Sequence, residues 1–201
     1  MNLLTDKKII LASASPRRLA LLRQVGVEPE VLPVQVKERH DLEGLSPETL
    51  VIYNATLKAQ AAREAARKPG LILGADTVVV CGGRLFGKPR DRAEAVAMLA
   101  TLSGATHSVF TGQCLIDSES GATVAAARET QVTFDEMSED AIVAYVNSGE
   151  PLDKAGAYGM QGMGGLFVRG ISGDYSTVVG LSLPLLYQMV RSLSREESGQ
   201  A

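Results

Sequence analysis

The chain has few of the residues on which several classes of protein depend. Its two cysteines, Cys81 and Cys114, are far apart and form no C-x-x-C pair, which argues against a disulfide framework or a zinc site. Two free thiols in apolar surroundings favour a reducing, cytosolic compartment. The two histidines, His40 and His107, have the spacing of neither a metal site nor a catalytic triad, and no G-x-S-x-G motif is present.

Long apolar runs and an excess of basic charge are missing as well. The most apolar stretch, residues 71–80, is interrupted by Asp76 and is too short to cross a membrane. The apolar run after Lys7 and Lys8 is too brief for a signal peptide, so we expect mature protein there. The net charge of -3 argues against a general binder of nucleic acids or anionic membranes, although it is compatible with a local basic cleft.

The remaining composition is that of an ordinary globular protein. Apolar residues make up 45% and charged residues 21% of the chain, and 201 residues are enough to bury a sizeable core. No internal repeat or long linker divides the sequence. We therefore expect one domain over residues 1–201, with two lobes around one cleft and a polar C-terminal tail at 195–201.

Hydrophobic periodicity predicts alternating strands and helices in the first half of the chain and an antiparallel hairpin in its middle. The expected strands span residues 9–12, 30–36, 71–80, 106–116, 122–134 and 166–171. The expected helices begin at Pro16, span 46–67, begin at Asp91, and span 138–147 and 182–194. A tight turn is expected at 81–84, and residues 149–165 form a glycine-rich loop that is too long and polar for a simple turn.

The junction between the first strand and the first helix carries the clearest functional signal. Ser15 is the expected N-cap and Pro16 the first helical residue, so Arg17 and Arg18 stand at a helix N-terminus. The free amides and the dipole favour an anion there, and guanidinium groups bind phosphate oxygens in pairs. The junction predicts a site for a phosphorylated small molecule. The alternative is an ordinary capped helix with two solvated arginines.

One acidic residue, Asp76, interrupts the buried strand expected at 71–80. A carboxylate in an apolar strand is costly unless it is paired or binds a metal, so Asp76 is either functional or part of a structural ion pair. Lys88 follows the hairpin that begins just after this strand, and the turn can bring it back toward Asp76. The alternative for Lys88 is a solvated side chain.

Other candidate residues are weaker when each is taken alone. Lys58 lies among small alanines that permit close helix packing, but a solvated face is the default expectation for it. Glu38 is a candidate metal ligand or base at the end of a strand, and a surface charge by default. In the glycine-rich loop, Lys154 adds charge for a phosphate, and Gln161 can exchange hydrogen bonds with a base edge. The loop lacks the Walker pattern.

Together these residues make a nucleotide-sized set, and the chain resembles the Maf family of nucleoside triphosphate pyrophosphatases, also called septum formation inhibitors. The matching segments follow the family's order along nearly the whole chain: residues 11–18, 74–77, 87–89, 153–162, 171–175 and 178–181. The resemblance implies an inosine-triphosphatase-like (Maf/Ham1) α/β fold with a mixed twisted sheet flanked by helices, a deep central cleft and a homodimer. It also implies hydrolysis of a nucleoside triphosphate to the monophosphate and pyrophosphate with a divalent metal, Mg²⁺ or Mn²⁺.

The resemblance assigns roles to individual residues. Asp76 falls on the family's catalytic aspartate, its proposed proton acceptor, and Glu38 on an acidic residue near the second strand. These two are the expected metal ligands, and Lys58 and Lys88 fall on the family's lysines and complete the expected catalytic set. The expected substrate-binding residues are Ser13, Arg17, Arg18, Thr77, Lys154 and Gln161.

Thr77 and Gln161, with Arg17, fall on three specificity positions of the family. Thr77 and the segment 153–162 resemble the subgroup that cleaves dTTP and UTP. The chain also departs from the family pattern, at Thr56, Leu57, Thr177 and the displaced Pro184. Two alternatives stay open: a non-catalytic nucleotide-binding regulator of cell division, and a Maf enzyme that prefers 7-methyl-GTP.

Overall fold

The centre of the molecule is a mixed sheet in which seven strands of the described residues take part. The computed structural model describes residue 4 and residues 6–197. The strand order is β2-β1-β3-β5-β6-β7, and the short β4 pairs with β3. The strands are β1 (Ile9–Leu11), β2 (Glu30–Val31), β3 (Leu71–Cys81), β4 (Arg84–Phe86), β5 (Thr106–Asp117), β6 (Thr123–Phe134) and β7 (Val168–Ser172). β1 runs parallel to β2 and β3, and the other pairs are antiparallel.

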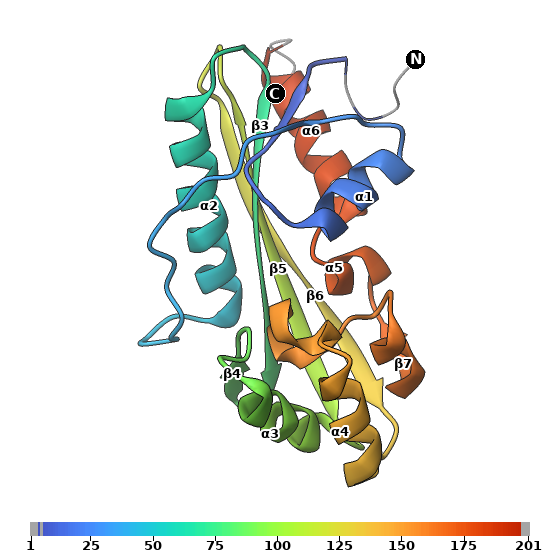
Figure 1. Ribbon diagram of the computed structural model, residues 1–201. Helices are drawn as coiled ribbons and strands as arrows, with labels where there is room; N and C mark the ends of the chain where they lie inside the picture. The colour runs from blue at the N-terminus through green and yellow to red at the C-terminus, as the bar shows by residue number, and fades with distance from the viewer. Residues whose placement is uncertain (1–3, 5, 198–201) are drawn as a thin grey trace.

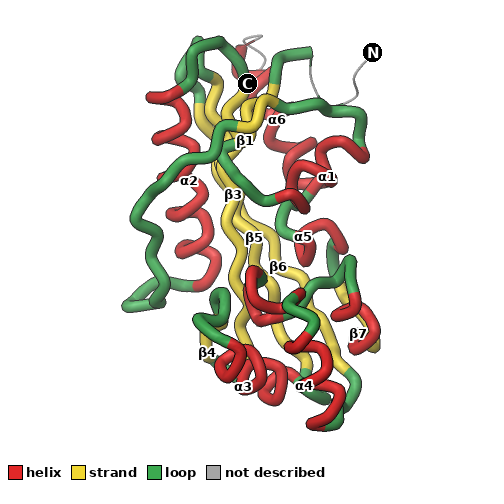
Figure 2. The backbone as a smooth tube through the Cα atoms, viewed as in Figure 1, coloured by secondary structure: helices red, strands yellow, loops and turns green. Residues whose placement is uncertain are grey.

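Helices cover the sheet on both faces and at one end (Figure 1). The helices are α1 (Pro16–Gln24), α2 (Pro47–Ala65), α3 (Arg92–Leu102), α4 (Glu139–Asn147), α5 (Tyr175–Val179) and α6 (Leu183–Glu197), with the 3₁₀ turns η1 (Glu150–Asp153), η2 (Ala155–Ala157) and η3 (Met163–Phe167). Figure 2 shows α2 on one side of the long strands and α1, α5 and α6 on the other. In the same view α3 and α4 lie near the end of the sheet where β4 is found. No helix of the described residues is long and apolar enough to cross a membrane.

Every second side chain of β3 points to the same face of the sheet, and on this face the side chains belong to two separate hydrophobic cores. Leu73 and Ala75 belong to a core that also includes residues of α1 and α6. Val79 and Cys81, further along the same face, belong to a core with residues of α3 and α4. Successive side chains of a strand point to opposite faces, so Thr77 lies on this face between the two cores. Thr77 and Val79 line a cavity over this part of the strand.

The opposite face of the sheet is packed directly against α2. Gly74 on β3 and Gly112 on β5 leave no room for a side chain, because a Cβ on Gly74 would overlap the carbonyl oxygen of Ala55. A Cβ on Gly112 would likewise overlap the backbone of Val51. These two glycines let the helix backbone approach the sheet closely. The close approach brings polar side chains of α2 within reach of the centre of β3.

One edge of β3 is open at its middle. On this edge β1 pairs with residues 71–73 and β4 with residues 79–81, so among the described strands residues 74–78 are paired only with β5 on the other edge. The loops that follow β1 and β4 diverge from this gap. Sites in α/β sheets form where neighbouring connections part in this way, and Asp76 lies at the centre of the gap.

Most of the expected elements are confirmed, including both halves of the β5–β6 hairpin and the helix caps at Ser46, Asp91 and Ser138. Both cysteines are free and buried. The strand expected at 30–36 is wrong beyond Val31, because the neighbouring β1 ends at Leu11 and offers no further partner.

The second half of the chain differs from the expectation in three places. Residues 149–165 contain 3₁₀ turns rather than an irregular loop throughout, and α5 was not expected from the sequence. Asp174 starts α5 by accepting a hydrogen bond from the amide of Ser176. The last helix continues through 195–197, so that part of the expected polar tail is helical; residues 198–201 lie outside the described residues.

Candidate active site

The gap beside β3 opens into a cavity of about 1080 Å³. Every site residue expected from the sequence lines it: Ser13, Arg17, Arg18, Glu38, Lys58, Asp76, Thr77, Lys88, Lys154 and Gln161. These side chains come from the β1–α1 junction, the loop before α2, α2 itself, β3, the loop after β4 and the segment of 3₁₀ turns. The fold therefore brings the set together from distant parts of the sequence, while the role of each residue stays a prediction.

Asp76 is a buried carboxylate with a different partner on each oxygen. Lys58 Nζ lies 2.8 Å from Oδ1, and Asn54 Nδ2 donates to Oδ2 at 2.9 Å. Burial raises the pKa of Asp76, but the charge and hydrogen bond of Lys58 and the hydrogen bond of Asn54 outweigh it, and the pKa falls below its ordinary value. The Asp76 carboxylate is thus ionised at neutral pH and held in a defined orientation.

Lys58 bridges two carboxylates. Its Nζ lies 2.8 Å from Glu38 Oε2 as well as 2.8 Å from Asp76 Oδ1, and its side chain is only 12% exposed. The default expectations of a solvated Lys58 and an isolated surface Glu38 are therefore wrong. The physical reason is the close packing of α2, whose small residues Ala55 and Ala59 are fully buried against the sheet.

The carboxylates of Glu38 and Asp76 fit a divalent cation. They already converge on one positive charge, the Lys58 ammonium, and carboxylate oxygens are the ligands that Mg²⁺ prefers. Among the described residues no group of three or more His, Cys, Asp or Glu side chains is placed to hold a metal. A pair of carboxylates suits an ion that takes its other ligands from substrate phosphates and water.

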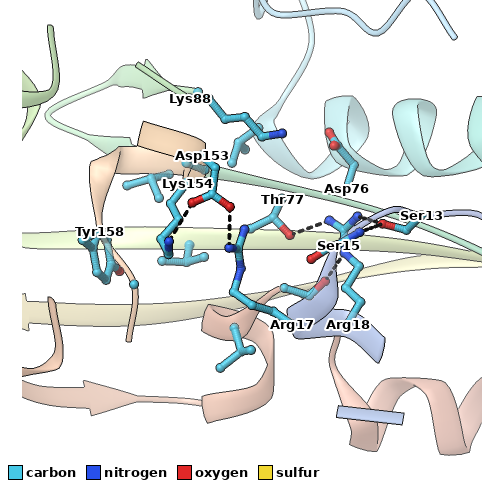
Figure 3. A pocket seen from close by; sticks show the side chains of 18 of the residues that line it. Ser13, Ser15, Arg17, Arg18, Asp76, Thr77, Lys88, Asp153, Lys154 and Tyr158 are labelled. Atoms are coloured by element: carbon cyan, nitrogen blue, oxygen red, sulfur yellow. Dashed lines mark hydrogen bonds and ion pairs between the residues drawn. The ribbon is translucent and has the colours of Figure 1, made fainter. Parts of the chain in front are cut away.

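Arg18 is a half-buried cation that lines the cavity. Its guanidinium donates to the carbonyl of Gly180 at 2.8 Å, to Ser13 Oγ at 3.0 Å and to Thr77 Oγ1 at 3.3 Å (Figure 3). Burial lowers the pKa of Arg18 and the charge of Asp76 raises it, and arginine stays protonated throughout the physiological range. Arg18 thus joins the β1–α1 junction to β3 and to the turn before α6.

The start of α1 differs in one respect from the expectation. Ser15 occupies the N-cap position, but its side chain makes no capping hydrogen bond, so a capping role for its hydroxyl is wrong. Ser13 Oγ instead accepts from the amide of Ser15 at 3.2 Å. Pro16 stands at the start of the helix as expected. The first amides of α1 consequently have no side-chain cap and are available to an anion.

A bridge of charges crosses the cavity at the N-terminus of α1. Arg17 Nη1 lies 2.9 Å from one oxygen of Asp153, and Lys154 Nζ lies 2.6 Å from the other (Figure 3). Burial raises the pKa of Asp153, but the hydrogen bonds of Lys154 and Arg17 lower it to about 2. Arg17 and Lys154, both expected to bind phosphate, are thus paired with a carboxylate of the protein itself.

Lys88 and Gln161 face the cavity from exposed positions. Within the part of the chain that the structure describes, neither side chain has a hydrogen-bond or ion-pair partner. In Figure 3 the Lys88 side chain extends in the direction of Asp76. The backbone next to Gln161 is held by Glu150, whose carboxylate accepts from the amides of Met163 and Gly164.

Two residues of this site were missed in the sequence. Asn54 lies four residues before Lys58, a spacing that places both on one face of α2, and this relation was a usable signal. Asp153 begins the segment 153–162 that resembles the family, but its pairing with Arg17 depends on contacts across the cleft and has no local signal.

The chain is similar to known proteins along nearly its whole length. The family model described as Maf-like protein matches residues 8–193. A dTTP/UTP pyrophosphatase of Gloeobacter violaceus is 48% identical over 189 residues, which cover 94% of this chain and 97% of the relative. A dTTP/UTP pyrophosphatase of Moorella thermoacetica is 49% identical over 88% of this chain and 90% of the relative. Among solved structures, a HAM1 protein from Coxiella burnetii is 18% identical, covers 94% of this chain and 99% of its own, and has a TM-score of 0.48.

Proposed function

This chain belongs to the Maf family, and we propose that it hydrolyses dTTP and UTP to the nucleoside monophosphate and pyrophosphate. Relatives that carry the name dTTP/UTP pyrophosphatase share 45% to 49% of their residues with it over most of its length. The observation that carries the proposal is the placement of Asp76, a buried ionised carboxylate in a cavity that Arg17, Arg18, Lys58 and Lys88 also line.

The cations answer the first requirement of the reaction, which is to hold a polyanion. Four negative charges on a triphosphate repel an attacking oxygen, so the α-phosphorus becomes reactive only when these charges are neutralised. Arg17, Arg18, Lys88 and Lys154 all line the cavity with positive charge. These groups bind the phosphates and stabilise the departing pyrophosphate.

Asp76 answers the second requirement, which is to activate water. Water attacks the α-phosphorus, the bond from this phosphorus to the bridging oxygen breaks, and pyrophosphate leaves with the bonding electrons. Asp76 accepts the proton of the attacking water, a contribution of about 10²–10⁴-fold for a well-placed base. The lowered pKa of Asp76 keeps the carboxylate ready to orient this water at neutral pH.

Glu38 and Asp76 are the residues that would hold Mg²⁺ or Mn²⁺. The bound ion would supply further charge neutralisation at the phosphate oxygens. The Lys58 ammonium lies between the two carboxylates and is a further cation at the site, besides Arg17, Arg18, Lys88 and Lys154. Lys58 thus draws the two carboxylates together and holds them at the site before substrate arrives.

Three residues from different elements of the fold select the base. Gln161 is exposed to the cavity and has both a donor and an acceptor on its amide, which match the edge of a pyrimidine. Thr77 lies beneath the cleft, where Arg18 and Thr111 fix its hydroxyl. Arg17, the third specificity position, reaches the same space from the start of α1.

A substrate screen tests the function directly. Purified protein is incubated with dTTP, UTP, the other common nucleoside triphosphates and 7-methyl-GTP, with Mg²⁺ or Mn²⁺, and pyrophosphate and monophosphate are both measured. We expect equal amounts of the two products and the highest kcat/KM for dTTP and UTP. Nucleotide binding without pyrophosphate release would instead support a non-catalytic regulator. Preference for 7-methyl-GTP would move the chain to another subgroup of the family.

Two further features belong to the proposal. We expect a homodimer, which sedimentation of the purified protein measures, and a cytoplasmic location, which cell fractionation measures. The free, buried thiols of Cys81 and Cys114 are consistent with a reducing compartment.

A further inference from the structure

We propose that Asn54 is a positioning residue that fixes the Asp76 carboxylate and the loop carrying Glu38 in one arrangement. The inference rests on the proposed roles of Asp76 and Glu38 in the reaction. Asn54 lies on α2, is 1% exposed and is not among the residues that line the cavity. Any effect it has on the reaction is therefore exerted through its neighbours.

The side-chain amide of Asn54 makes hydrogen bonds both to Asp76 and to the backbone of Arg39. Its Nδ2 donates to Asp76 Oδ2 and to the carbonyl oxygen of Arg39, each at 2.9 Å, while its Oδ1 accepts from the amide of Arg39, also at 2.9 Å. Two of these bonds make a closed pair with the backbone of the residue next to Glu38. The third reaches the proposed catalytic base. One buried side chain thereby connects two functional carboxylates that are far apart in sequence.

The geometry gives each oxygen of Asp76 its own anchor. Lys58 contacts Oδ1 and Asn54 contacts Oδ2, and the two anchors stand one turn apart on the same helix. A carboxylate held at both oxygens cannot rotate freely, so the direction in which it accepts a proton is fixed. If Lys58 turns toward phosphate, Asn54 remains as the anchor that does not depend on substrate.

The loop that carries Glu38 needs an external support. Residues 32–46, between β2 and α2, form no helix or strand. The Asn54–Arg39 pair and the ion pair of Glu38 with Lys58 attach this loop to α2. Apolar residues of the loop, Leu32, Val34 and Leu42, also pack against cores that include α2. Because the ion pair must open for Glu38 to bind a cation, the Asn54 pair is the polar contact that then holds the backbone beside Glu38 at the site.

The test is Asn54→Leu, an apolar replacement of similar size. Loss of an outer partner of a ligand or base typically costs 10- to 100-fold in activity, so we expect kcat to fall by about this factor. The KM for the nucleotide should stay within about threefold, since the cations that line the cavity are untouched. Hydrogen exchange supplies a readout independent of activity: the Arg39 amide should exchange faster in the variant than in the wild type.

The matched control is Ser103→Ala in the other lobe, where Ser103 Oγ accepts from the amide of Met137 at 2.7 Å. It removes a partly buried hydrogen bond without touching the cavity, so kcat and the exchange of Arg39 should not change. If Asn54→Leu does not fold, Asn54→Ser is measured in its place against the same expectations. Its hydroxyl stands on a side chain one bond shorter and cannot reproduce the three contacts.

The outcomes separate this inference from the proposed function. A kcat within threefold of the wild type, or an equal loss of kcat in Ser103→Ala at a matched melting temperature, would overturn the positioning role. Asp76→Asn is measured in parallel. If that variant is fully active, the proposed catalytic role fails and the inference fails with it, whereas an inactive Asp76→Asn beside a fully active Asn54→Leu removes only the inference.

Discussion

The two walls of the cavity are built in different ways. One wall consists of α2 and β3, where Asp76, Asn54 and Lys58 contact one another in nearly buried surroundings. The other wall is the segment 150–167, which contains three short 3₁₀ turns joined by loop residues and carries exposed groups such as Asp153. Asp76 and Lys58 on the first wall belong to packed elements, whereas Lys154 and Gln161 on the second wall lie in turns and loops. This division lets one wall stay rigid while the other adapts to the ligand.

The two walls differ in the free energy that a single polar contact contributes. On the buried wall, loss of one partner leaves a polar group without a hydrogen bond, at a cost of about 1–3 kcal/mol. On the exposed wall, an ion pair such as Arg17–Asp153 contributes about 0.2–1 kcal/mol, because water screens it. Changes on the buried wall should therefore act on kcat and stability, and changes on the exposed wall mainly on KM.

The largest effect should come from Asp76→Asn. The amide has the shape of the carboxylate but accepts no proton from water, so kcat should fall by about 10²–10⁴-fold, measured as pyrophosphate release. The melting temperature should show that the fold is kept. Asp135→Asn is the control, because Asp135 pairs with Arg169 at an exposed site outside the cavity. Normal turnover in Asp76→Asn, or equal losses in both variants, would contradict the assignment.

Gly74→Ala tests whether the rigid wall depends on close packing. The added methyl group would overlap the carbonyl oxygen of Ala55, so α2 must move away from β3. Overpacking of this kind costs about 1–3 kcal/mol of stability. Displacing Lys58 and Asn54 from Asp76 should reduce kcat by up to about 10²-fold. Urea unfolding and steady-state kinetics measure the two effects.

Gly170→Ala is the control for this substitution. Gly170 lies on β7, and a Cβ there would meet nothing within 4 Å. We expect stability and kcat close to those of the wild type in the control. A Gly74→Ala protein that behaves in the same way would show that the approach of α2 does not set the geometry of the site.

A change on the exposed wall should have a smaller effect on catalytic efficiency and should raise it rather than lower it. Asp153 holds Arg17 and Lys154, and a triphosphate must compete with its carboxylate for both cations. Asp153→Asn removes this competition, so the KM for dTTP should fall by about two- to fivefold, the range that exposed ion pairs allow. The kcat should change little. A KM that rises would mean that Asp153 holds the segment 150–167 in place rather than competing with substrate.

The same division explains what the sequence could predict. Asp76 was recognisable because a charge inside an apolar strand is exceptional, and the α1 start because Pro16 and two arginines mark it locally. Lys58 looked like an ordinary helical lysine, since its partners depend on how closely α2 approaches the sheet. That approach depends on Gly74, whose role is visible only once the helix is placed against it.

Long-range contacts limited the prediction elsewhere too. The strand expected at 30–36 has a suitable pattern, but its length is decided by β1, which ends at Leu11. The Ser15 hydroxyl has the right position for a cap, yet the amides of α1 remain uncapped. In both cases the local sequence pattern is present, but the length of the strand and the capping of the helix depend on residues that are distant in sequence or on other hydrogen bonds.

The smallest effect should appear in the pH dependence of stability. The pKa of Asp153 is lowered from 3.8 to about 2 in the folded protein, so its ion pairs stabilise the fold fully above about pH 4 and lose this effect as the pH falls through 2. The carboxylate is 61% exposed, so the difference in unfolding free energy between wild type and Asp153→Asn should be below about 1 kcal/mol at pH 7. Urea unfolding at pH 7, 4 and 3 should show this difference shrinking on acidification. A difference that grows toward pH 3 would mean that the bridge between Arg17 and Lys154 strains the folded state, and the exposed wall would then be held by other contacts.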